Sequence, residues 1–121
     1  EGNFLSEQGG LFFQAEGFKL KIPEEKAAKL KSYTEKRVIF GIRPADLPEA
    51  PCSVPGETID VVVEVMEPLG NEVFLDVKAG DQSLIARADP STTAKPHAKL
   101  CLKPNPENMN FFDIRDEQAL L

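Results

Sequence analysis

Hydrophobic and polar residues alternate along most of the chain, and this period of two predicts short β-strands. The alternation is clearest in the second half. The rows expected to face inward are Ile59, Val61, Val63 and Val65, then Val73, Leu75 and Val77, and then Leu84, Ala86 and Ala88. Turns at Gly70-Asn71 and Gly80-Asp81 separate the rows, so neighbouring segments are expected to pair as antiparallel hairpins.

The first half predicts a hairpin, a helix and a further strand. Segments 11–14 and 18–22 flank a three-residue connection that ends in Gly17, which is a hairpin signal. Pro23 suits the first helical position and two glutamates follow it, so we expect a helix of about two turns there. A strand is expected over 37–42, and it ends before a proline because proline cannot donate to a sheet.

Short strands are also expected around Leu100 and Leu102 and at Phe111-Phe112. Residues 48–56 contain three prolines and predict a loop, the best candidate for a flexible stretch within the chain. Short strands linked by glycine turns favour a mainly β fold, an antiparallel sandwich or small barrel with one short helix. We expect a single domain over residues 1–121.

Composition narrows the class of protein without pointing to a reaction. The 121 residues include 14 basic and 20 acidic ones, a net charge of −6, so the basic surface of a nucleic-acid binder is not expected. No apolar run reaches the roughly 18 residues of a membrane-spanning helix. Cys52 and Cys101 are too few for a disulfide scaffold, and a bridge between the two stays open.

The search for catalytic and metal-binding residues finds isolated candidates only. His97, the single histidine, lies in a loop without a nucleophile motif, and the sequence contains no G-x-x-x-x-G-K-[ST] phosphate loop. The carboxylates of Asp60, Glu64 and Glu67 are expected on or beside a solvated strand face. The residues therefore indicate a binding or regulatory module rather than an enzyme, with no metal or cofactor of its own.

Five segments resemble, in the same order, one known family. They are Asn-Phe-Leu at 3–5, Gly-Ile-Arg-Pro-Ala-Asp-Leu at 41–47, the strand and turn at 63–72, Leu-Ile-Ala-Arg at 84–87 and Asn-Phe-Phe-Asp at 110–113. The second is close to the family pattern G-I-R-P-E-D/H-L, and the third to V-x-V-x-E-x-L-G-x-E. The chain is similar to the C-terminal regulatory region, of TOBE or OB type, in ATP-binding subunits of maltose-type ABC importers.

This resemblance implies an OB-type β-barrel cut from a longer subunit, and the absence of an initiator Met agrees with such a fragment. In the family, the N-terminal ATPase domain holds ATP and Mg²⁺ and contacts the permease subunits. The region similar to this chain joins two subunits about a two-fold axis, and in some members it docks a regulatory protein. The implied location is cytoplasmic, peripheral on the inner face of the cell membrane, without direct membrane insertion.

The resemblance also places the candidate interface and regulatory residues. These are Gly41, Ile42, Arg43, Pro44, Phe111 and Phe112. Gly41 interrupts an apolar strand, which favours a bulge or a close approach by another backbone. Adjacent phenylalanines on a strand point to opposite faces, so one can fill the core while the other faces outward. Burial of both rings is the competing interpretation.

The chain departs from the family pattern at three positions. His97 stands where the family has a glycine after Lys-Pro, in a turn that needs a positive φ. Ala45 replaces a glutamate and Asn110 replaces a histidine. These changes leave the regulatory specificity open.

Two other functions remain as alternatives. The first is a module that binds a small ligand such as an oligosaccharide, an anion or a metabolite, although the chain has no Trp and only one Tyr, Tyr33. The second is an oligonucleotide-binding OB module, which the net negative charge disfavours. The residues of this chain do not identify the transported substrate.

Overall fold

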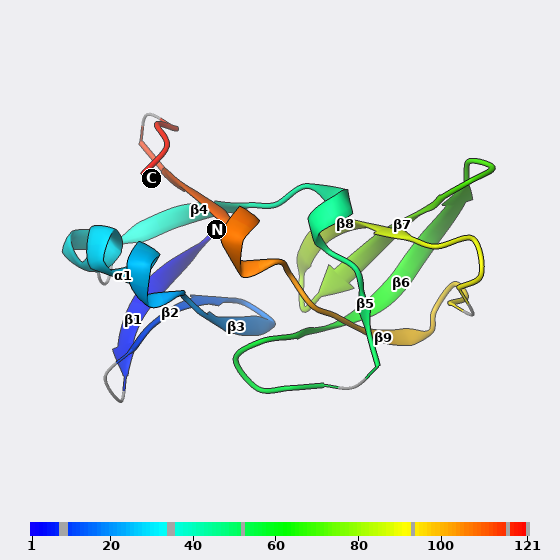
Figure 1. Cartoon of the computed structure of the whole chain (residues 1–121), viewed down its shortest axis with the longest axis horizontal. Helices are drawn as coiled ribbons and strands as arrows, with labels where there is room; N and C mark the ends of the chain where they lie inside the picture. The colour runs from blue at the N-terminus through cyan, green and yellow to red at the C-terminus, as the bar shows by residue number, and fades with distance from the viewer. Residues whose placement is uncertain (8–9, 34–35, 52, 93, 116, 121) are drawn as a thin grey trace.

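The chain forms two five-stranded antiparallel sheets in a computed structural model (Figure 1). The structure describes residues 1–7, 10–33, 36–51, 53–92, 94–115 and 117–120. The first sheet has the spatial order β10 (Asn110–Asp113), β4 (Arg37–Gly41), β1 (Gly2–Glu7), β2 (Gly10–Ala15) and β3 (Phe18–Lys21). The second has the order β5 (Glu49–Ala50), β9 (Lys99–Leu102), β6 (Ile59–Pro68), β7 (Val73–Ala79) and β8 (Gln82–Ala88).

One short α-helix accompanies the sheets, as the sequence predicts. Helix α1 (Glu24–Leu30) begins directly after Pro23 and buries Ala27 and Leu30. Three 3₁₀ turns complete the described helical structure. They are η1 (Lys31–Tyr33), η2 (Pro44–Asp46) and η3 (Pro106–Asn108). Among the described residues, no helix combines the length and the apolar character that crossing a membrane requires.

The predicted hairpins form, with small changes in their limits. Strands β2 and β3 pair as expected, but Ala15 belongs to the ladder opposite Phe18, so the connection has two residues instead of three. The β6–β7 and β7–β8 turns lie at Gly70 and Gly80, both with a positive φ. His97 also has a positive φ of 70°, the conformation expected for this turn. Strand β1 was not predicted.

One expected inward residue faces outward. The register between β6 and β7 shifts between Val63 and Val65, which is a β-bulge. Because an extra residue reverses the alternation, Val63 is fully buried whereas Val65 is 53% exposed. The prediction that Val65 continues the row of Ile59 and Val61 is therefore wrong, and Met66 packs against the core in its place.

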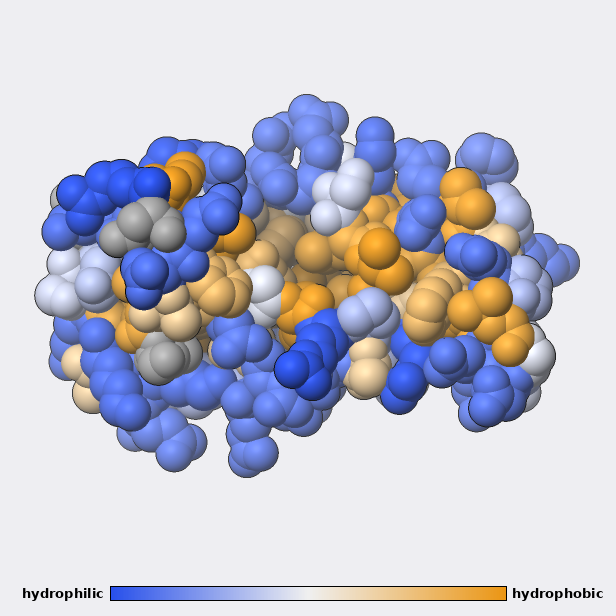
Figure 2. All heavy atoms as spheres, turned by 90° about the horizontal axis from the view of Figure 1, so that it is seen from above, coloured by the Kyte–Doolittle hydropathy of each residue, from blue (hydrophilic) through white to orange (hydrophobic). Residues whose placement is uncertain are grey.

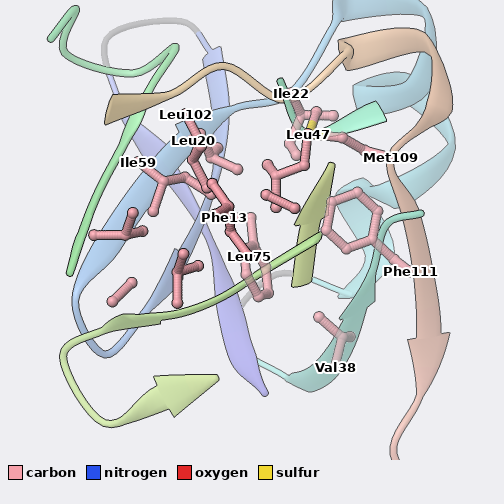
Figure 3. Close-up of a cluster of buried hydrophobic side chains, with 14 of the residues drawn as sticks. Phe13, Leu20, Ile22, Val38, Leu47, Ile59, Leu75, Leu102, Met109 and Phe111 are labelled. Carbon is pink, nitrogen blue, oxygen red and sulfur yellow. The ribbon is translucent and has the colours of Figure 1, made fainter. Parts of the chain in front are cut away.

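Both sheets contribute to one hydrophobic core (Figure 3). Phe13 and Leu20 come from the first sheet, and Ile59, Leu75 and Leu102 come from the second; each is at most 2% exposed. Burying aliphatic or aromatic side chains of this size stabilises a fold by about 1.5–3 kcal/mol each. The two sheets are therefore expected to unfold together.

The tips of two hairpins, one from each sheet, touch through their backbones. Gly17 in the β2–β3 turn has a φ of 97°, and a Cβ built there would lie 2.5 Å from the carbonyl carbon and oxygen of Ala79. Beside this contact, a hydrogen bond with the Asp81 side chain raises the pKa of Glu16, and repulsion between the two carboxylates adds to the shift. The contact leaves no room for a side chain at Gly17.

We predict that Gly17→Ala destabilises the chain more than Gly70→Ala. Gly70 also has a positive φ, 87°, but nothing lies within 4 Å of its hypothetical Cβ. Gly70→Ala should therefore cost only the backbone strain, about 1 kcal/mol, whereas Gly17→Ala must also separate the two turns, a further ~2 kcal/mol. Urea unfolding measures both variants. Equal losses of stability would show that the contact between the turns contributes nothing.

Candidate functional site

The candidate interface residues lie where two segments cross between the sheets. The first crossover, residues 42–48, leads from β4 to β5, and the second, residues 103–109, leads from β9 back to β10. Strand β10 pairs with β4, with Asn110 opposite Gly41 and Phe111 opposite Phe40. The structure thus brings Gly41 beside Phe111 and Phe112 at one edge of the first sheet, whereas residues 42–44 continue beyond the paired part of β4 into the first crossover (Figure 1).

Phe111 fills the core of the first sheet. Its side chain is 1% exposed. Ring centroids of Phe4, Phe13 and Phe40 lie 5.0, 5.3 and 5.6 Å from that of Phe111. Aromatic pairs at these separations add to the stabilisation from buried area. Any influence of Phe111 on a partner would therefore act through packing, since its ring is not on the surface.

Phe112 points to the opposite side of β10 and covers Gly41. The Phe112 side chain is half-buried, and a Cβ built at Gly41 would lie 2.9 Å from Cε2 of its ring. The sequence predicted either a bulge or a close approach by another backbone at Gly41. The approach exists, but the neighbour is an aromatic side chain from the adjacent strand.

The exposed part of the group is formed by the end of β4. Ile42 and Pro44 are half-buried, and Arg43 is exposed. The Arg43 carbonyl accepts a hydrogen bond from the backbone N–H of Asp46 at 2.9 Å, which closes η2. The next residue, Leu47, is fully buried. Arg43 is thus held on a short, anchored turn, residues 43–46, which we call the Arg43 turn. Its side chain is exposed to solvent.

Hydrogen bonds tie the two crossovers to each other. The Asp46 carbonyl accepts from the backbone N–H of Asn105 at 2.9 Å, and the Asp46 carboxylate accepts from the side-chain amide of Asn108 at 2.9 Å. Farther along, the backbone N–H of Lys103 donates to the carbonyl of Pro48 at 2.9 Å. A displacement of residues 41–44 would therefore be transmitted through these hydrogen bonds to the second crossover, which connects the two sheets.

Helix α1 is hydrogen-bonded to the second crossover. The Lys26 ammonium donates to the carbonyl oxygens of Pro106, Glu107 and Met109, at 3.2, 2.6 and 3.1 Å. Charge-assisted hydrogen bonds of this kind are stronger than neutral ones. The partners of Lys26 and Asp46 lie 80 and 62 residues away in the chain, so the local sequence does not reveal these contacts.

Next to Phe112, the C-terminal end of β10 carries a local ion pair. The Arg115 guanidinium and backbone N–H donate to the Asp113 carboxylate, and these hydrogen bonds lower the pKa of Asp113. The pair lies within one turn of the chain and stabilises that turn.

The isolated chemical candidates do not assemble into a site. In the described part of the chain, no three His, Cys, Asp or Glu side chains are placed to share a metal ion. The Cys101 thiol donates to Asp60 at 3.2 Å. Cys52 lies outside the described residues, so the bridge to Cys101 is not tested. A cleft of about 510 Å³ between β3 and the second crossover is lined by Phe12, Ile22, Pro55 and Met109 among others.

Comparison with known proteins shows what this arrangement is similar to. Residues 4–47, which include β4 and the Arg43 turn, match the model of the MalK OB fold domain. The expected fold class, mainly β and OB-type with one short helix, is confirmed by this match and by the sheets described above.

Relatives extend the similarity of this OB domain to nearly the whole chain. It is 34% identical over 123 residues to the multiple sugar-binding transport ATP-binding protein MsmK of Streptococcus mutans, covering 99% of the chain and 31% of that protein. It is 33% identical over 126 residues to the uncharacterized ABC transporter ATP-binding protein YurJ of Bacillus subtilis, covering 99% and 34%. The sulfoquinovosyl glycerol transport ATP-binding protein SmoE of Agrobacterium fabrum is 31% identical over 83 residues, covering 69% and 23%.

These comparisons confirm the resemblance to ATP-binding subunits of sugar ABC transporters. The chain spans about a third of the length of MsmK and YurJ. They do not test the roles expected for Gly41, Arg43 and Phe112, which stay predictions.

We predict that Gly41→Ala destabilises the OB domain through Phe112. The new methyl group must displace the Phe112 ring, at a cost of about 1–2 kcal/mol. Gly10→Ala is the matched control, because the atom nearest to its hypothetical Cβ, Lys21 Cε, is 3.5 Å away, an ordinary contact. In a Phe112→Ala background, Gly41→Ala should cost much less. A double-mutant cycle from urea unfolding measures the coupling; additive effects would contradict the packing of Gly41 against Phe112.

Proposed function

We propose that this chain is the regulatory and dimerisation domain of the ATP-binding subunit of an ABC transporter that imports carbohydrates. The observation that carries the proposal is the alignment of 99% of the chain with the sugar-transport protein MsmK. In this proposal ATP and Mg²⁺ bind in the ATP-binding part of the subunit, and the present domain contributes no catalytic residue. The subunit lies at the inner face of the cell membrane, on its permease partners.

The action of the domain would be mechanical. Two subunits that open and close with nucleotide must stay together while their ATP-binding parts separate, and a symmetric contact between their regulatory domains provides this. A two-fold contact uses the same surface on both copies. The exposed Arg43 turn fits this role because it is anchored by buried Leu47 and by the hydrogen bonds between the crossovers.

The same surface would also transmit regulation. A regulatory protein or the second copy that moves the turn at 42–44 also pulls on Asp46, and through Asp46 on the second crossover. The two sheets would then shift relative to each other about the crossovers. Such a coupling requires that the turn have two positions with different affinities for the partner.

We predict that the isolated chain dimerises weakly and that Arg43→Glu weakens this dimer. The contact of one small domain falls below the roughly 1,000 Å² of a stable interface, so the apparent mass should rise with concentration. Sedimentation equilibrium should show at least about tenfold weaker association for Arg43→Glu. The substitution removes the positive charge that contacts the partner and puts a repelling negative charge in its place. Lys95→Glu makes the same change of charge at an exposed position of the loop between β8 and β9 and should leave association unchanged.

A strict monomer up to millimolar concentration would contradict the dimerisation role. Equal weakening by Arg43→Glu and Lys95→Glu would show that net charge, rather than the Arg43 turn, controls association. Titration calorimetry with maltose, molybdate and single-stranded DNA separates the alternatives: specific binding of any of these at micromolar concentration would favour a ligand-binding module.

A further inference from the structure

The outer face of the second sheet carries the exposed hydrophobic side chains. The large hydrophobic residues that are exposed in the described part of the chain are Val62, Val65, Leu69 and Ile85, at 39, 53, 47 and 50%. All belong to β6, β8 or the β6–β7 turn. Figure 2 shows hydrophobic residues gathered over the half of the molecule that holds this sheet. Clustered exposure of this kind marks interaction surfaces more often than single exposed residues do.

The strand register shows which side chains are neighbours on this face. Val65 lies opposite Asp76, and Asp76 lies opposite Ile85, so the three form one row across β6, β7 and β8. In the next row, Phe74 stands between Glu67 and Arg87. Side chains directly opposite each other in an antiparallel pair share a face. An exposed carboxylate is therefore flanked on both sides by an exposed aliphatic side chain.

The charges on the face are unevenly matched. Lys78 pairs with Glu64 at 3.8 Å, and Arg87 pairs with Glu72 at 3.3 Å, so both basic residues already have a carboxylate partner. Within the described part of the chain, the carboxylates of Asp76 and Glu67 make no ion pair or hydrogen bond. The face of β6–β8 therefore combines apolar surface with two carboxylates that have no counterion, and the exposed Lys99 of neighbouring β9 stands opposite Val62.

This combination determines what can cover the face. Any partner that contacts Val65 and Ile85 also covers Asp76, and a covered carboxylate without a counterion is strongly unfavourable. Nucleic acid would bring phosphates, which Asp76 repels, and a second copy of the same face would bring a second Asp76 together with lysine and arginine side chains that already have carboxylate partners. The complementary surface has a Lys or Arg flanked by aliphatic side chains.

We propose that the outer face of β6, β7 and β8 is a docking surface for a basic, aliphatic segment of a protein partner, with the Asp76 carboxylate as its ionic anchor. This surface shares no residue with the Arg43 turn, and the proposal does not depend on dimerisation. The bulge at Val63–Val65 creates it, because without the bulge Val65 would face the core.

The test uses the 121-residue chain and two synthetic twelve-residue peptides, one alternating valine with arginine and one alternating valine with glutamate. Titration followed by ¹H–¹⁵N NMR should show shifts from the arginine peptide that centre on β6–β8, and none of comparable size from the glutamate peptide. Asp76→Asn should weaken binding at least about tenfold, the loss expected for one charge-assisted hydrogen bond. Glu25→Gln removes one negative charge from exposed helix α1 and should not change binding.

Several results would overturn the proposal. They are equal binding of both peptides, shifts centred on another part of the chain, and equal weakening by Asp76→Asn and Glu25→Gln. Concentration-dependent shifts of β6–β8 without peptide would show that a second copy is the occupant. The unfolding midpoint of Asp76→Asn serves as the control for folding, and Val65→Ser, which removes aliphatic area without a change of charge, must also weaken binding.

Discussion

The contact between the two sheets is the constraint on which the rest of the structure depends. Each sheet has a hydrophobic side, and neither can bury it without the other: Leu20 of β3 meets Ile59 and Leu102 of the second sheet in one cluster (Figure 3). At the rim of this contact the backbone of Gly17 touches that of Ala79. Because the hairpin tips meet without side chains between them, the sheets approach closely enough to share a core.

The positions of the two candidate surfaces follow from this packing. In the described part of the chain, only two segments cross between the sheets. One leads from β4 to β5 and the other from β9 to β10, and the Arg43 turn lies on the first. The outer face of β6–β8 is the side of the second sheet that the shared core leaves uncovered. One surface therefore lies at the junction of the sheets, where η2 packs next to β8, and the other lies on the outer face of the second sheet, so they present different residues to a partner.

Local signals predicted much of the fold. The alternation over Val73, Leu75 and Val77 and the glycines at 70 and 80 specified a hairpin by themselves, and the structure has it. The bulge at Val65 could not be predicted in this way, because it depends on how β6 pairs with both β7 and β9. The burial of Phe111 likewise depends on Phe4 and Phe13, which lie about a hundred residues earlier in the chain.

The residues of the candidate site were predicted better than their environment. A glycine in an apolar strand signals a close neighbour, but the identity of that neighbour, Phe112, comes from a pairing of distant strands. Lys26 gave no signal, since an isolated lysine looks like an ordinary surface residue, and the motif at 41–47 contains Asp46 without indicating its partners. Their importance appears only where the chain returns to them at 105–109.

Native-state hydrogen exchange tests most directly whether the two sheets form one cooperative unit. The slowest amides of β1–β2 and of β6–β7 should exchange with the same opening free energy, equal to that of global unfolding, because both strand pairs bury the same core. A second sheet that opens with a free energy lower than that of the first by more than about 1 kcal/mol, beyond the usual scatter of such values, would contradict the shared core and the coupling through the crossovers.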